Sequence, residues 1–150
     1  MRCEPIGFIK SPVTEGIDHS WGDIESEIHL KASLSGGLEK LDQFSHAIII
    51  FYMHQSPVFD LKTDLIRKPQ GRLDMPEIGI FAQRAKHRPN PIGMTVVQII
   101  SIMENILRVK GLDAIDGTPV LDIKPYFPIF DRINKTKTPK WVDELMMNYF

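Results

Sequence analysis

The sequence predicts a mainly β protein, a small closed or nearly closed β-barrel of about seven strands with a C-terminal helix. Seven short segments have the alternating or continuously apolar pattern of strands, whereas helix signals are few. Closing the sheet into a barrel leaves no strand edge exposed. The chain of 150 residues contains no linker, internal repeat or low-complexity tract, so residues 1–150 are expected to form one domain.

Three of the expected strands lie before residue 54. Residues 6–10 form a short strand that Ser11 and Pro12 end. Residues 24–30 alternate, which places Ile24, Ile28 and Leu30 on one face and charged or polar side chains on the other. Residues 47–53 are continuously apolar, as expected of a fully buried strand.

The remaining strands and the helices follow from similar patterns. Residues 78–83, 95–103, 106–111 and 120–123 read as strands, the middle two joined in a hairpin by Glu104 and Asn105. Residues 38–44 predict a helical turn. A C-terminal helix is predicted with Thr138 as N-cap and Pro139 as its first residue. Its apolar stripe, which is expected to pack against the core or a second subunit, comprises Trp141, Val142, Leu145, Met146 and Tyr149.

Composition limits the binding partners and the cellular compartment that can be expected. The net charge of −1 gives no overall attraction to nucleic acid, but residues 67–88 hold six basic and two acidic residues, a net of +4. Such a segment can attract phosphates, or it can be an ordinary solvated face. Cys3 is the only cysteine, which favours a reducing compartment. No apolar run reaches the length of a signal peptide or a membrane span, so we expect a cytoplasmic protein without membrane contact.

Residues 79–93 carry the first chemical motif, GIFAQRAKHRPNPIG. Arg84 and Arg88 stand four positions apart, and the prolines that follow keep the chain out of helical geometry. The motif predicts a rigid cationic loop, the kind of element on which proteins often place functional groups. The alternative is a basic surface turn.

Residues 111–126, GLDAIDGTPVLDIKPY, form the second motif. Asp113, Asp116 and Asp122 fall within ten residues, close to Lys124. A single aspartate is often only a turn former, but three that run into a strand favour a site. Because one apolar hairpin separates the two motifs, both are expected to reach the same end of the sheet.

Several common chemistries are disfavoured. The chain has neither a G-x-G-x-x-G fingerprint nor a phosphate-binding P-loop, so a doubly wound nucleotide fold is unsupported. Its five histidines lack metal-ligand spacing, and no metal is expected. A hydrolase built on Ser45, His46 and Asp122 lacks the nucleophile elbow.

The two motifs together resemble the TsaA-like family, whose best-known members are the TrmO-type tRNA methyltransferases. The resemblance extends to IGFIKSP, FSHAIIIFYMHQ and residues 74–79, and so spans nearly the whole chain. It implies a small β-barrel that binds S-adenosylmethionine (SAM), usually as a homodimer. The implied reaction is N6-methylation of a threonylcarbamoyl-modified adenosine next to the anticodon of threonine tRNA.

The family pattern also implies which residues bind SAM. Arg84 suits the carboxylate of the methionine moiety because a guanidinium can pair with a carboxylate through two bonds. Met94 would pack against an apolar part of the cofactor. The full implied set comprises His54, Gln55, Arg84, Met94, Asp113, Ala114, Ile115 and Asp116.

Several residues are candidates for roles in catalysis and substrate binding. Methyl transfer requires the acceptor nitrogen and the methyl group in near-attack geometry, and a group that accepts a proton. Asp116 or Asp122 can serve as that base, while Lys124 or Arg88 can lower the pKa of the nitrogen. Tyr126 can stack on a splayed-out base or pack in the core. The candidate substrate contacts are Arg88, Asn90, Tyr126, Lys68 and Arg72.

Two departures from the family pattern bear on these expectations. A Pro-Arg-Gln type segment holds the cofactor in many members, but residues 16–23 here read GIDHSWGD. Longer members also continue past the barrel with a C-terminal domain, so the SAM core is better supported than the tRNA substrate. The alternatives are a SAM-dependent methyltransferase for a small molecule or another RNA, and a SAM-binding module without catalysis.

Overall fold

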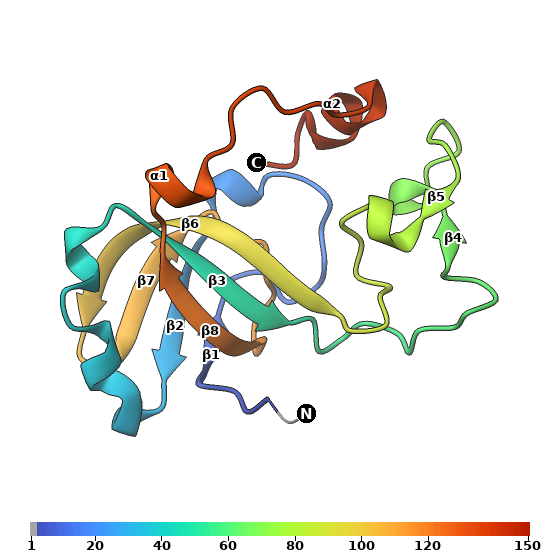
Figure 1. Cartoon of the computed structure of the whole chain (residues 1–150). Helices are drawn as coiled ribbons and strands as arrows, with labels where there is room; N and C mark the ends of the chain where they lie inside the picture. Colours follow the sequence, from blue (N-terminus) through green and yellow to red (C-terminus); the bar gives the residue numbers. More distant parts are fainter. Residues whose placement is uncertain (1–2) are drawn as a thin grey trace.

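The computed structural model describes residues 3–150 and is built around a closed antiparallel barrel (Figure 1). The strand order is β1-β2-β7-β6-β3-β8, and β8 pairs with β1 to close the barrel. The mainly β prediction is therefore confirmed, with six barrel strands in the described residues instead of about seven. They are β1 (Gly7–Lys10), β2 (Glu25–Leu30), β3 (His46–Tyr52), β6 (Ile92–Met103), β7 (Ile106–Lys110) and β8 (Pro119–Pro125).

Alternating side chains fill the barrel. On β2, Ile28 and Leu30 point into the core as predicted. On β3, the expectation of burial on both faces is corrected, because the strand alternates between fully buried and less buried side chains. Its inward set is Ala47, Ile49 and Phe51. The hairpin between β6 and β7 turns at Glu104 and Asn105 as predicted, although β6 starts at Ile92, three residues earlier than expected.

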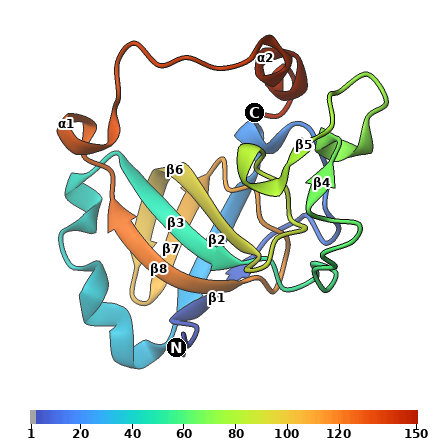
Figure 2. The same cartoon turned by 45° about the vertical axis from the view of Figure 1, so that its right-hand side comes forward.

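The predicted strand over residues 78–83 does not belong to the barrel. Of these residues only β5 (Ile78–Gly79) forms a strand, and it pairs with β4 (Ile66–Arg67), a strand too short for any sequence pattern to reveal. The 3₁₀ turn η5 (Ile80–Ala82) follows, since Ile80 turns inward and becomes buried. Residues 53–91, here called the excursion, thus leave the barrel after β3 and return at β6 (Figures 1 and 2).

Short helical segments complete the chain. The turn expected over residues 38–44 corresponds to η3 (Leu41–Gln43), preceded by η2 (Ala32–Leu38). The C-terminal helix α2 (Lys140–Met146) begins one residue later than predicted, because Pro139 has an extended ψ of 149° and is itself the N-cap in place of Thr138. The other segments are η1 (Trp21–Asp23), η4 (Pro69–Gly71) and α1 (Pro128–Asp131). Among residues 3–150, no helix has both the length and the apolar character that crossing a bilayer requires.

Gly93, near the start of β6, is a point of close approach. It lies opposite Phe51 on β3, and a Cβ atom added to it would come within 2.3 Å of the buried Phe51 ring. Only glycine therefore fits at the end of the RPNPIG segment without moving that ring.

Candidate functional site

Three segments that are distant in sequence meet at one end of the barrel. They are the turn after β3 with His54 and Gln55, the first residues of β6, and the loop that joins β7 to β8. Thr95 on β6 donates a hydrogen bond to Asp113 in that loop. The Nδ1 atom of His54 lies 3.4 Å from the Thr118 hydroxyl at the end of the same loop. The two sequence motifs thus reach the same end of the sheet, as expected.

Arg84 reaches this cluster from the excursion. One Nη atom donates to the carbonyl oxygen of Met94 at 2.7 Å, while the side chain stays exposed. Arginine carries five N–H donors, so most of its fork remains available to an anionic ligand. Met94 itself is 51% exposed at the start of β6.

Asp113 is the largely buried carboxylate of the cluster. Its Oδ1 accepts from Thr95 and its Oδ2 accepts from the hydroxyl of Tyr149 at 2.8 Å. Burial raises the pKa of Asp113 above its ordinary value, while these two hydrogen bonds and the nearby Arg84 act in the opposite direction. Burial and the Asp113 charge together raise the pKa of the Tyr149 phenol.

Asp116 fastens the loop to the end of β1. Its carboxylate accepts from the Ser11 backbone N–H at 3.0 Å and pairs with the Lys10 ammonium at 3.3 Å. The Ser11 hydrogen bond is the main cause of the lowered pKa of Asp116. Between the two aspartates, Ala114 is buried and Ile115 half-buried. These contacts therefore bring together Arg84, Met94, Asp113 and Asp116, and Ala114 and Ile115 lie in the loop between the two aspartates. The other two predicted cofactor residues, His54 and Gln55, form the adjoining turn.

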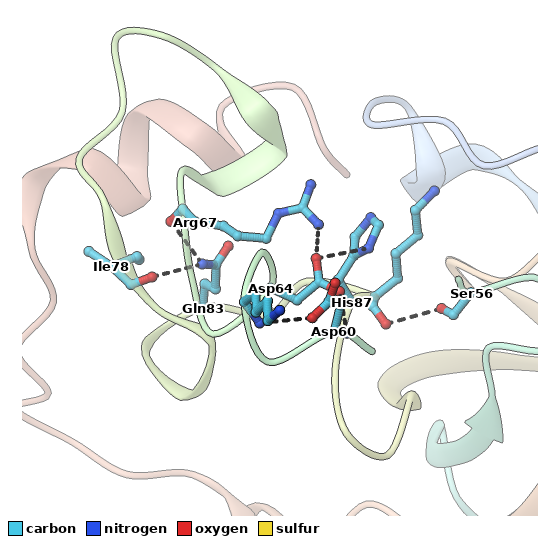
Figure 3. Close-up of polar contacts among 9 residues, drawn as sticks. Ser56, Asp60, Asp64, Arg67, Ile78, Gln83 and His87 are labelled. Atoms are coloured by element: carbon cyan, nitrogen blue, oxygen red, sulfur yellow. Dashed lines mark hydrogen bonds and ion pairs between the residues drawn. The ribbon is translucent and has the colours of Figure 1, made fainter. Parts of the chain in front are cut away.

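A buried carboxylate organises the excursion that carries Arg84 (Figure 3). Asp64 is 5% exposed and accepts hydrogen bonds from the Asp60 backbone N–H and the Arg67 guanidinium. The Nδ1 atom of His87 lies 3.8 Å from the same carboxylate. Gln83, next to Arg84, donates to the carbonyl oxygens of Arg67 and Ile78. This network joins both ends of the excursion and limits where Arg84 can lie.

Arg88 supports the same loop from within. One Nη atom donates to the carbonyl oxygens of Ile80 at 3.1 Å and Gln83 at 2.6 Å, and the guanidinium lies 5.9 Å from the Phe81 ring centroid. These contacts give Arg88 a structural role, whereas Asn90 is exposed nearby in the Pro-Asn-Pro turn.

The positive charge of the excursion is partly neutralised. Residues 53–91 hold seven Lys or Arg and four Asp or Glu, a net of +3. Arg67 pairs with Asp64, and Arg72 pairs with Asp74 at 2.6 Å. The ammonium of Lys68 donates to the Leu73 carbonyl oxygen at 2.9 Å. The charge count over residues 67–88 misses the partner of Arg67, because Asp64 precedes that segment and folds back onto it.

Three predicted residues on or after β8 lie away from the cluster. Asp122 and Lys124 form an ion pair with each other at 2.6 Å. The backbone N–H of Tyr126 donates to the carbonyl oxygen of His46, the first residue of β3. His54 lies two residues beyond Tyr52, the last residue of that strand. Seven strand residues span roughly 20 Å, so Tyr126 and His54 lie at opposite ends of the barrel.

Two contacts of Asp113 are not evident from the sequence. Thr95 carries no signal of its own, and Tyr149 belongs to the apolar stripe of the predicted C-terminal helix. The helix α2 ends at Met146, so Tyr149 lies beyond the helical stripe to which the sequence assigned it. A largely buried phenol also needs a partner for its hydroxyl group. That requirement is the available signal, although it does not identify the partner.

Other features lie apart from the cluster. A surface hollow of about 380 Å³ is lined by η2 and by part of β8, including Leu34 and Asp122, on the opposite side of the barrel from the excursion. None of the predicted cofactor residues lines it. Within residues 3–150, no group of three or more His, Cys, Asp or Glu side chains gathers closely enough to hold a metal ion.

Comparison with known sequences gives consistent matches. The family model described as the tRNA-methyltransferase O N-terminal domain matches residues 17–132. A probable S-adenosyl-L-methionine-binding protein of Pyrococcus abyssi is 39% identical, over 87% of this chain and 71% of that protein. An S-adenosyl-L-methionine-binding protein of Archaeoglobus fulgidus is 37% identical, over 90% of this chain and 96% of that protein.

Longer proteins match as well. The tRNA (adenine(37)-N6)-methyltransferase of Escherichia coli is 36% identical, over 88% of this chain and 60% of that enzyme. The crystal structure of TrmO from Pseudomonas aeruginosa superposes with a TM-score of 0.72 and 31% identity, over 91% of this chain and 60% of the other. The chain thus spans about three-fifths of these two proteins.

The Asp64 network predicts a pH-dependent excursion. Hydrogen bonds and ion pairs hold the pKa of Asp64 below its ordinary value, the backbone hydrogen bond from Asp60 most of all. The ionised carboxylate therefore stabilises the excursion above about pH 4, and this stabilisation is lost as the pH falls through the lowered pKa. We expect backbone amide protection over residues 60–88, corrected for intrinsic exchange, to fall in acid. The Asp64→Asn variant should show this reduced amide protection at every pH.

Asp74→Asn is the matched control. It removes the same charge from an exposed ion pair with Arg72, and exposed pairs contribute little. Equal protection in wild type and Asp64→Asn at neutral pH would contradict the organising role of Asp64.

Proposed function

We infer the function of this chain from its family, because it belongs to the tRNA-methyltransferase O (TrmO) family. It is a SAM-dependent methyltransferase of that family, and SAM is its cofactor. We further propose that it methylates N6 of a threonylcarbamoyl-modified adenosine next to the anticodon of a tRNA. The E. coli relative, named as a tRNA (adenine(37)-N6)-methyltransferase, supports this substrate.

The observation that carries the proposal is the convergence of Arg84, Asp113 and the His54 turn at one end of the barrel. The residues fit SAM, a molecule with a carboxylate, an ammonium and a sulfonium. The exposed fork of Arg84 suits the carboxylate, and the free lone pairs of Asp113 suit the cationic part. The exposed Met94 side chain offers an apolar contact, and residues 113–116 offer backbone donors and acceptors.

When bound, SAM would supply an electrophilic methyl group, whose C–S bond would break as the C–N bond forms, and the acceptor nitrogen would have to pass a proton to a base. Asp116 is the one proposed base that lies in the cluster, but its lowered pKa makes it a weak base. The Asp122–Lys124 pair lies elsewhere on β8, and Arg88 is held by backbone carbonyl groups. We therefore propose that orientation of the two reactants supplies most of the rate.

The rival functions are methyl transfer to a small molecule or another RNA, and SAM binding without catalysis. The last is favoured by one observation: the relatives from P. abyssi and A. fulgidus are named only as SAM-binding proteins. Incubation with radiolabelled SAM and total tRNA from cells that lack this protein separates the three. We expect protein-dependent label in tRNA. Binding of SAM without labelled tRNA would contradict the proposed substrate.

Arg84→Ala is expected to weaken SAM binding at least tenfold, because a desolvated charge-assisted pair is worth about 2–5 kcal/mol. Isothermal titration calorimetry measures the dissociation constant. Arg108→Ala is the control, since Arg108 pairs with Glu25 on the barrel surface. Equal affinity for SAM in the wild type and Arg84→Ala would remove Arg84 from the site.

The proposed tRNA surface is the basic part of the excursion. Lys68→Ala with Arg72→Ala should weaken tRNA binding, and the slope of log affinity against log salt should flatten by roughly 0.7–0.9 for each phosphate that is no longer neutralised. SAM affinity should not change. The double change Lys31→Ala with Lys40→Ala removes the same charge beside η2 and should leave tRNA binding intact. Unaltered tRNA affinity in the first variant would argue against this surface.

We also propose a homodimer. Large apolar side chains are exposed in and after α1, with exposed fractions of 98% for Ile129, 82% for Phe130 and 76% for Ile133. Burial of such a patch favours association. Light scattering at micromolar concentration should report twice the chain mass of 17.2 kDa. A monomer mass would overturn the proposal.

A further inference from the structure

We propose that Tyr149 is a positioning residue of the cofactor site, whose hydroxyl group holds the Asp113 carboxylate ready for the positively charged part of SAM. The inference rests on the proposed function, since it assumes that Asp113 faces the cofactor. Tyr149 lies outside residues 17–132, the part of the chain that the family model matches.

The hydrogen bonds of Asp113 leave room for a ligand. Thr95 donates to one carboxylate oxygen and Tyr149 to the other, at 2.8 Å in the second case. A carboxylate accepts about four hydrogen bonds, so it keeps the capacity to accept from a ligand beside Thr95, Tyr149 and the backbone N–H of Asp113 itself. The two donors come from different elements, one from β6 and one from the segment after α2, and together they fix the plane of the carboxylate.

The position of Tyr149 is set by its own backbone. The backbone N–H of Ser20 donates to the carbonyl oxygen of Asn148, and that of Trp21 donates to the carbonyl oxygen of Tyr149, both at 2.8 Å. Trp21 is 2% exposed, and its indole N–H donates to the Ile17 carbonyl oxygen. In both views the C-terminal end of the chain lies beside η1 (Figures 1 and 2). The backbone around Tyr149 is therefore anchored to Ser20 and Trp21 independently of Asp113.

Gly22 permits this anchoring. A Cβ atom on Gly22 would lie 2.8 Å from the backbone carbonyl carbon of Phe150. The approach of the two backbones brings the Tyr149 ring over the cluster, where the ring of Phe150 packs against it with centroids 5.0 Å apart. An anchored donor orients its acceptor before the ligand arrives.

Electrostatics give the contact a function beyond packing. The groups that act on Asp113 are Thr95 from β6, Arg84 from the excursion, Tyr149 and the backbone N–H of Asp113 itself. Asp18 acts on Tyr149 from the loop before η1. Burial raises the pKa of Asp113, and the Tyr149 hydrogen bond opposes that rise. Without the hydroxyl, Asp113 takes up a proton at higher pH and loses its attraction for a cation.

Tyr149→Phe tests the inference, since it removes one oxygen atom and keeps the ring. The dissociation constant for SAM, measured by calorimetry between pH 5 and 8, is expected to rise roughly tenfold at neutral pH. The pH below which binding weakens should also move upward. Tyr126→Phe, which removes a hydroxyl group at the opposite end of the barrel, should change neither quantity.

A double-mutant cycle with Asp113→Asn separates positioning from general structural damage. If Tyr149 acts through the carboxylate, Tyr149→Phe should have little further effect once Asp113 is Asn. Additive losses would overturn the inference, as would a Tyr149→Phe variant with wild-type affinity and pH dependence. Tighter binding would also overturn it, because it would mean that Tyr149 blocks the site. A wild type that does not bind SAM contradicts the proposed function itself.

Discussion

Closure of the barrel through β1 and β8 is the constraint on which the site depends. The pairing of Gly7 with Val120 sets the loop that precedes β8 beside the end of β1, where the Ser11 N–H and the Lys10 ammonium meet Asp116. Because β3 runs antiparallel to β8, the turn after β3 lies at the same end and brings His54 to Thr118. The positions of Asp116 and His54 therefore follow from the pairing of β8 with β1 and β3, whereas Arg84 is brought to the same end by the excursion.

The two arginines of residues 79–93 show how packing assigns different roles to the same residue type. Arg88 lies where two backbone carbonyl groups converge, and it satisfies both of them. Arg84 finds a single carbonyl oxygen, that of Met94, and keeps most of its donors. The number of unsatisfied acceptors within reach decides which guanidinium is structural and which can meet a ligand.

Sequence patterns predicted those features that depend on local repetition. Alternation located β2, and the pair Glu104-Asn105 located the β6–β7 turn. Patterns failed where distant segments decide the outcome: residues 78–83 read as a barrel strand, yet Ile80 is buried in a separate small sheet region. The contact of Tyr149 with Asp113 joins positions 36 residues apart, which no periodicity encodes. The two motifs stand out in the sequence, but the ion pairs that neutralise part of the excursion do not.

Gly93 changes how mutational scans of this protein should be interpreted. It belongs to the most distinctive motif of the chain and adjoins Met94, so a loss of activity on substitution invites the conclusion that it contacts the cofactor. The structure gives another cause, because any side chain at that position collides with the Phe51 ring inside the barrel. Sensitivity at position 93 reports the packing of the core, and a second substitution that shrinks Phe51 is the appropriate means of separating the two effects.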